Sequence, residues 1–366
     1  MASSIADADV GRAAAGSHGP AAWTRALPVL AAWARRLGGV AATLAGLLAL
    51  TFFIGRVMPV DPVLSIVGPD ADRSTYEQVR ATLGLDQPLP VQFGRYLASL
   101  AEGDLGRSVL SGNPVREDIA RVFPATVELA TLAIVLGTAL GVPMGVWAAA
   151  RRGRAVDHAV RLISLIGHST PVFWFAMMGL LLFYAVLGWA GGSGRVALEF
   201  DGLVAPRTGL LLVDAAWAGE WEVWRSALRH ILLPAAILAL HAMACIARMT
   251  RSFMLAQLGQ EYILAARVKG LGERAVLWRH AFRNCRVQLL TIVALTYGGL
   301  LEGAVLVETV FGWPGFGQYL TSSLMLGDMN AVMGSVLLVG LLFIGLNLLS
   351  DLLYQVFDPR TRSGRD

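Results

Sequence analysis

Few residues of this sequence have the types and spacing that catalysis or metal binding requires. Ser193 stands in the stretch GGSG, with His230 or His241 as conceivable bases that would activate it as a nucleophile. The stretch lies in a connection between apolar runs, however, where glycine and serine usually make a turn. The 6 histidines are too dispersed for a metal site. We therefore expect no catalytic residue and no metal site.

The chain also lacks the residues of a nucleotide-binding loop. Such a loop requires lysine in GKS or GKT, and the only lysine of the chain, Lys269, stands in VKG. The chain therefore cannot hydrolyse ATP through such a loop, and we expect it to bind no cofactor.

The elements that must position any functional residue are membrane-spanning helices. The chain is 55% apolar and only 15% charged, with a mean hydropathy of +0.59, whereas soluble domains carry roughly 25% charge. A helix of roughly 20 residues crosses the hydrocarbon core, and lipid excludes unpaired backbone groups. We predict an all-α membrane protein with six transmembrane helices: Leu37–Arg56, Thr126–Ala150, Leu162–Val186, His230–Ala247, Val287–Val307 and Ala331–Tyr354.

Basic residues indicate the orientation of these helices. Arginines are concentrated in the short connections Arg151–Arg161 and Arg248–Arg286, and the positive-inside rule then predicts that both termini are cytoplasmic. No aromatic residues alternate with the arginines as in a nucleic-acid groove. The predicted divisions are a flexible leader (1–36), the first span (37–56), an outer connection (57–125) with short helices, a core domain (126–354) and a cytoplasmic tail (355–366).

A few residues within the spans could line a path across the membrane. Glu302 and His241 are ionisable residues near mid-membrane, which is where ion-coupled transporters place theirs. Pro171 interrupts the third span. Glu302 could face a path, pack as a buried carboxyl or pair with a neighbouring helix. Glu308 lies nearer the outer surface, where a structural and a functional role are both open.

The connection Arg248–Arg286 contains a charged helical hairpin. From Glu261, the residues Tyr262, Ala265, Ala266 and Lys269 share one helical face, and Gly270 stands where a helix ends in a left-handed cap. A second helix is expected to begin at Glu273 and to lie on the membrane surface. Small side chains favour close approach by another protein, whereas a lipid anchor would present large apolar ones; anchoring to anionic lipid remains the alternative.

This hairpin resembles the EAA loop of permeases of ABC importers, in the dipeptide/oligopeptide/nickel branch. EYILAARVKG is followed, ten residues after its glycine, by HAFRN. The family's Glu-Ala-Ala and Gly positions fall on Leu264, Ala265, Ala266 and Gly270; leucine in the first position is usual in the peptide branch. The resemblance continues in order through LGLDQPLPVQFGRYL, GDLGRS, FPATVELA, PVFWFAMM, RHILLPAAILAL, ARMTRSFM, VETVFGWPGFG and DPR.

The resemblance implies a type I importer permease fold with a cytoplasmic coupling helix in loop 248–286. It implies that separate ATPase subunits, which hold ATP and magnesium, dock there. The implied partners are two ATPases, a second homologous permease and a periplasmic or lipid-anchored solute-binding protein in the bacterial inner membrane. Peptides are the expected substrate, with nickel or another small solute as the alternative. The implied docking residues are Glu261, Tyr262, Ala265, Ala266, Lys269, Gly270, Leu271, His280 and Arg283.

Overall fold

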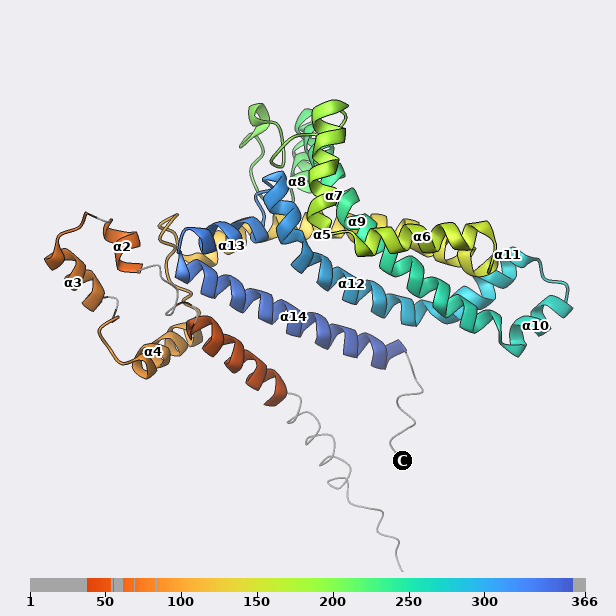
Figure 1. Cartoon of the computed structure of the whole chain (residues 1–366), viewed down its shortest axis with the longest axis horizontal. Coiled ribbons are helices and arrows are strands. Elements are labelled where there is room, and N and C mark those ends of the chain that lie inside the picture. Colours follow the sequence, from red (N-terminus) through yellow and green to blue (C-terminus); the bar gives the residue numbers. More distant parts are fainter. Residues whose placement is uncertain (1–37, 54, 56–61, 69, 83, 358–366) are drawn as a thin grey trace, which may run out of the picture. The chain divides into compact units, whose positions relative to one another are not determined.

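The structure, a computed structural model, describes residues 38–53, 55, 62–68, 70–82 and 84–357. Within these residues the chain is helical, with no strand and one isolated bridge between Arg107 and Pro114, so the predicted all-α class is confirmed. Residues up to Gly46 form a unit of their own, and Leu47–Asp366 forms a second unit that contains the bundle (Figure 1). The predicted leader and most of the predicted tail lie outside the described residues.

Four helical runs of the second unit are long and apolar enough to cross a membrane. They are α5 (Val115–Ala150), α9 (Trp221–Leu258), the run Glu273–Phe311 and α14 (Met329–Phe357). The run Glu273–Phe311 consists of α11 (Glu273–Ala275), the π-helical η3 (Val276–Ala281) and α12 (Phe282–Phe311). The helix Gly38–Phe53 is apolar but shorter. The other elements are α2 (Pro62–Val67), α3 (Arg73–Thr82), α4 (Leu89–Ala101), α6 (Ala155–Ser169), α7 (Val172–Gly179), the π-helical η1 (Leu180–Val186), η2 (Leu198–Phe200), α8 (Leu211–Ala218), α10 (Glu261–Val268) and α13 (Phe316–Met325).

The third span predicted over Leu162–Val186 is broken at the proline that was predicted to interrupt it. The chain bends by 96° between α6 and the pair α7–η1. Pro171 explains the break, because proline donates no backbone hydrogen bond and forces the preceding residue out of the helical region. Thr170 accordingly has an extended backbone, with φ −84° and ψ 131°. Length and composition therefore give four spans among the described residues, or five if the bent pair counts as one; the first predicted span, Leu37–Arg56, lies partly outside the described residues.

Helices α5 and α9 form the centre of the bundle because glycines allow them close contact. Gly137, Gly141 and Gly145 share one face of α5. A Cβ atom built at Gly145 would lie 2.6 Å from the carbonyl oxygen of Ala247 and 2.6 Å from Cβ of Thr250. Small residues at a spacing of four permit this approach, and much of the buried apolar core lies along the same pair.

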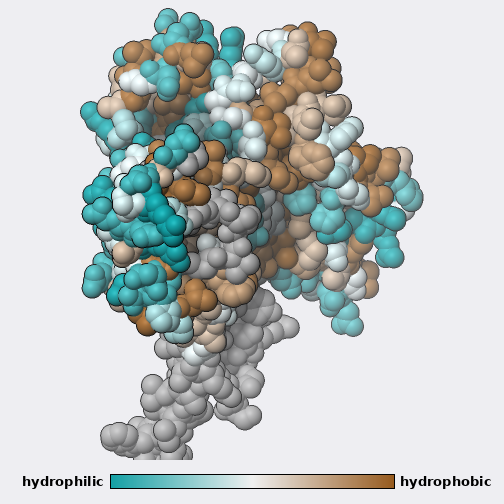
Figure 2. All heavy atoms as spheres, turned by 60° about the vertical axis from the view of Figure 1, so that its left-hand side comes forward, coloured by the Kyte–Doolittle hydropathy of each residue, from teal (hydrophilic) through white to brown (hydrophobic). Residues whose placement is uncertain are grey.

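Apolar side chains are exposed over a large part of the surface. Figure 2 shows hydrophobic residues intermingled with hydrophilic ones on the face in view. In α6, α7 and η1 the exposed apolar side chains include Leu165, Trp174, Met177 and Leu181. Such exposure suits helices covered by lipid or by another subunit. Helices α3 and α4 confirm the short helices predicted in the outer connection.

Candidate functional site

The predicted hairpin lies at one end of the bundle, here called the α10 end, opposite the α13 end (Figure 1). Helix α10 ends at Val268, and Gly270, the residue after its C-cap, has a φ of +78°. The amide of Gly270 donates to the carbonyl of Arg267 (2.9 Å), and the amide of Leu271 donates to that of Ala266 (3.3 Å). These two bonds define a Schellman cap, in which glycine is favoured because it accepts a left-handed backbone. The predicted positive φ at Gly270 is confirmed.

An ion pair holds the two sides of this turn together. The Arg267 guanidinium donates to both carboxylate oxygens of Glu273, at 2.9 and 3.4 Å. Both side chains are substantially exposed, so the pair contributes little stability. Together with the backbone cap, it fixes the direction in which the chain leaves α10.

The inner face of α10 packs on the bundle. Ile263 and Ala266 are buried in the same apolar cluster as Met254, Val276 and Cys285. Ala266 is therefore covered within this chain, and it is not part of a surface that a partner could reach. The predicted small-residue surface is wrong at this position, because Ala266 faces the bundle together with Ile263.

The outer face of α10 carries two large apolar side chains that are not among the predicted docking residues. Leu264 is 64% exposed and Val268 is 81% exposed; Leu271, which is one of the predicted docking residues, follows the turn and is 40% exposed. Residues four apart on a helix are neighbours, so Leu264 and Val268 lie side by side. The sequence feature that could have indicated this surface is a pair of large apolar residues four positions apart on a short helix.

The other predicted docking residues differ in their exposure. Glu261, Ala265 and Lys269 are exposed, and the Tyr262 hydroxyl donates to the side-chain oxygen of Gln257 at 2.7 Å. His280 is half-buried in η3, and Arg283 is exposed at the start of α12. The second helix begins at Glu273 as predicted, but it is not separate from the fifth predicted span. It continues without interruption to Phe311, so the turn is attached directly to a candidate span.

A buried ion pair joins α6 to α9 near the arginine-rich connection 151–154. Nε and Nη2 of Arg251 donate to the two carboxylate oxygens of Asp157, the second at 2.9 Å. The amide of Gly153 donates to the same carboxylate at 3.0 Å. This bidentate geometry fixes the start of α6 against α9.

The predicted path residues are not brought together. The ring of His241 stacks on that of His168, with centroids 5.2 Å apart. Glu302 is exposed on α12, so the structure does not show it as a packed carboxyl. Pro171 lies at the break between α6 and α7. Among the described residues, no hydrogen bond or ion pair joins Glu302 to His241.

The local contacts do not support Ser193 as a nucleophile activated by a histidine. Nδ1 of His230 lies 2.8 Å from the backbone oxygen of Ser226, and the Ser193 side chain lies beside Gly312. No hydrogen bond joins Ser193 to a histidine in the part of the chain that the structure describes. Within the same residues, no group of three or more His, Cys, Asp or Glu side chains could hold a metal ion.

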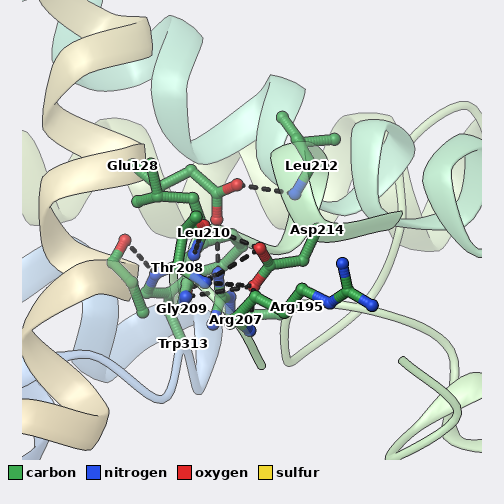
Figure 3. A network of polar contacts seen from close by, with 10 residues as sticks. Glu128, Arg195, Arg207, Thr208, Gly209, Leu210, Leu212, Asp214 and Trp313 are labelled. Carbon is green, nitrogen blue, oxygen red and sulfur yellow. Dashed lines mark hydrogen bonds and ion pairs between the residues drawn. The ribbon is translucent and has the colours of Figure 1, made fainter. Parts of the chain in front are cut away.

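Buried charges organise the connection between η1 and α9 (Figure 3). Glu128, on α5, accepts hydrogen bonds from the Arg195 guanidinium and from the amide of Leu212, the latter at 2.7 Å. Arg195 also lies 5.7 Å from the ring centroid of Trp313. A single carboxylate on a long helix thus secures a connection and the start of α8.

Asp214 holds the preceding turn in the same network (Figure 3). Its carboxylate accepts the hydroxyl of Thr208 at 2.7 Å and the amides of Arg207, Thr208 and Gly209 at 3.0–3.2 Å. Burial opposes its ionisation, but these hydrogen bonds outweigh burial and hold the pKa of Asp214 below its usual range.

Glu308 has a structural role that the structure makes plain. Its buried carboxylate accepts the hydroxyl of Thr126 and the amides of Gly317 and Gln318, the amides at 2.7 and 3.1 Å. Thr126 in turn accepts the amide of Phe316 at 2.8 Å. Glu308 therefore caps α13 and joins α12 to α5. A Cβ atom at Gly315 would lie 2.5 Å from this carboxylate, which explains a glycine there.

The long apolar helices define the class of this protein, an integral membrane protein built from a helical bundle. The chain belongs to the family of binding-protein-dependent transport system inner membrane components, whose model matches residues 141–363. The model of the family's N-terminal region matches residues 29–130. The resemblance seen in the sequence is thus confirmed.

Three relatives cover almost the whole chain. A probable D,D-dipeptide transport system permease protein of Escherichia coli is 41% identical over 332 residues, which are 90% of this chain and 97% of that protein. A di/tripeptide transport system permease protein of Pseudomonas aeruginosa is 40% identical over 91% of this chain and 98% of its own length. A dipeptide transport system permease protein of Escherichia coli is 42% identical over 90% and 97%.

Proposed function

We propose that this chain is the permease subunit of an ATP-binding-cassette importer and that its α10 turn is the coupling element on which an ATPase subunit docks. The observation that carries this proposal is the exposed pair Leu264 and Val268 on a short helix whose other face is buried. A helix fixed on one side and apolar on the other is suited to insertion into a groove of a second protein.

The rigidity of the turn favours docking on a protein over anchoring in lipid. The Schellman cap at Gly270 fixes the path of the chain, and the exposed Arg267–Glu273 pair bridges the same turn. A lipid surface is fluid and gains nothing from a fixed direction, whereas a force that must reach the spans requires it. Because the run from Glu273 continues to Phe311, displacement of the turn would be transmitted directly to a candidate span.

The remaining parts of the assembly follow from the family and the chemistry. The only lysine is Lys269, outside any phosphate-binding loop, so ATP and magnesium are assigned to two separate ATPase subunits. A second permease and a solute-binding protein complete the importer in a bacterial inner membrane. The proposed orientation has the α10 end and both termini in the cytoplasm, because the positive-inside rule favours that side for the arginine-rich connections.

Peptides are the proposed substrate. The names of the three relatives state dipeptides, D,D-dipeptides or di- and tripeptides, at 40–42% identity. Nickel or another small solute is the alternative within the same family. An ion-coupled transporter is the alternative outside it; Glu302 and His241 would then be its ionisable residues, and transport would continue without ATPase subunits.

A double substitution on the outer face of α10 tests the docking assignment. In the full complex, Leu264→Ser with Val268→Ser should leave this chain folded, because both side chains are exposed. Removing two apolar contacts from an interface should weaken ATPase association by about tenfold to a hundredfold. Co-purification of the ATPase and ATP-dependent uptake of a labelled dipeptide measure the loss.

The matched control for this experiment is Leu198→Ser. Leu198 is 93% exposed and lies in the connection between η1 and α9, away from α10. The Leu198→Ser variant should leave ATPase co-purification unchanged. Normal co-purification of the double variant would refute docking at this face.

A further inference from the structure

A pocket of ≈ 440 Å³ opens between α6 and α9 and has an unusual lining. One part is basic and the other is apolar, and no acidic side chain lines it. The residues that matter to its chemistry are His158, Arg161, Leu162, Leu165, Arg248 and Arg251.

Two of the three arginines in this lining form no ion pair with a described residue. Arg251 is committed to Asp157, whose carboxylate is completed by the amide of Gly153. Arg161 and Arg248 are exposed, and neither has an ion-pair partner among the residues that the structure describes. Arg161 also attracts the Asp157 carboxylate electrostatically, but that single negative charge is already bound by Arg251. The pocket therefore keeps a net positive charge, which favours an anion that can accept several hydrogen bonds.

The apolar part of the lining restricts what that anion can be. Helix α6 contacts α9 through a buried stripe that includes Val160, Ser164 and Gly167. Leu162 and Leu165 are left outside this contact, 58% and 62% exposed. A free inorganic anion would make no use of them, whereas a molecule with a charged head and an apolar chain would cover them.

We propose that this pocket binds the headgroup of an anionic phospholipid, with the phosphate between Arg161 and Arg248 and an acyl chain along Leu162 and Leu165. Basic pockets between membrane helices are suited to such headgroups, because the guanidinium groups replace the water and counterions around the phosphate. The bound lipid would cover the side of α6 that α9 leaves free, beside the Asp157–Arg251 pair.

Native mass spectrometry of the complete complex, with phosphatidylglycerol added in steps, tests the proposal. The variant is Arg161→Gln with Arg248→Gln, and the control is Arg152→Gln with Arg154→Gln, which removes the same charge from the exposed connection outside the pocket. We expect phosphatidylglycerol to bind the double pocket variant about thirtyfold more weakly than the wild type, since two basic contacts are lost. The control should bind within about twofold of the wild type, because its substitutions leave the pocket intact.

Three outcomes would overturn the proposal. Equal loss in both variants would show general attraction to surface charge. Displacement of the lipid by inorganic phosphate at equal concentration would show a site for a free anion. A crosslink from Leu165→Cys to another protein subunit would show that a protein covers the pocket. Unchanged assembly of the complex, measured in the same spectra, excludes misfolding of the variant.

Discussion

Two glutamates six positions apart on α12 have opposite surroundings, and this contrast decides what each residue does. Glu308 is fully buried and accepts hydrogen bonds from Thr126, Gly317 and Gln318. Glu302 is exposed and makes no hydrogen bond or ion pair among the described residues. The sequence shows both as acidic residues in an apolar run, because the partners of Glu308 come from α5 and from the chain after α12.

Truncating the two glutamates should therefore have different effects on stability. Glu308→Ala leaves two buried amides and a threonine hydroxyl without their acceptor, which should cost about 2–4 kcal/mol of unfolding free energy. Glu302→Ala, the matched control on the same helix, should change it by less than about 0.5 kcal/mol. Thermal unfolding of the purified chain in detergent measures both, and equal melting temperatures would contradict the capping role of Glu308.

At the scale of elements, the bundle depends on the close contact of α5 with α9. Glycines at a spacing of four favour close helix packing, and this pattern is local to α5. The choice of α9 as the partner depends on the whole fold and could not be read from α5 alone. The same distinction applies to Pro171: the residue signals a break in the third span, but it does not by itself specify the bend of 96°.

The same change, glycine to alanine, made separately at two positions tests this contact. Gly145→Ala places a methyl group 2.6 Å from the Ala247 carbonyl oxygen, so the helices must separate, at a cost of about 1–3 kcal/mol. Gly303→Ala, on α12, meets nothing within 4 Å and should be neutral or slightly stabilising, because alanine favours helix. Thermal unfolding in the same detergent compares them; a Gly145→Ala chain as stable as the wild type would show that the contact is not tight.

At the scale of the whole molecule, the sequence predicts the class of fold more reliably than it predicts which side chains a partner subunit would contact. Hydropathy predicted a helical membrane protein, and the motif series predicted its family. The cap at Gly270 was predictable because it depends on a few neighbouring residues. The burial of Ala266 and the exposure of Val268 were not, since α10 packs on Met254 and Val276 from other elements.

In the proposed importer, the α10 turn transmits the action of an ATPase to the spans. ATP-driven dipeptide uptake by the reconstituted importer, compared between Gly270→Val and Gly272→Val, tests this most directly. A Cβ atom meets nothing within 4 Å at either position, but φ is +78° at Gly270 and −63° at Gly272. Valine is therefore strained only at Gly270, by roughly 1–2 kcal/mol, and should redirect the turn there.

We predict that the Gly270→Val importer inserts in the membrane and that its binding protein still binds dipeptide. Its uptake should fall at least about tenfold, the change that corresponds to about 1.4 kcal/mol, and its ATPase association should weaken. The Gly272→Val importer should keep most of its uptake. Full ATP-driven uptake by the Gly270→Val importer would contradict the coupling role of the α10 turn.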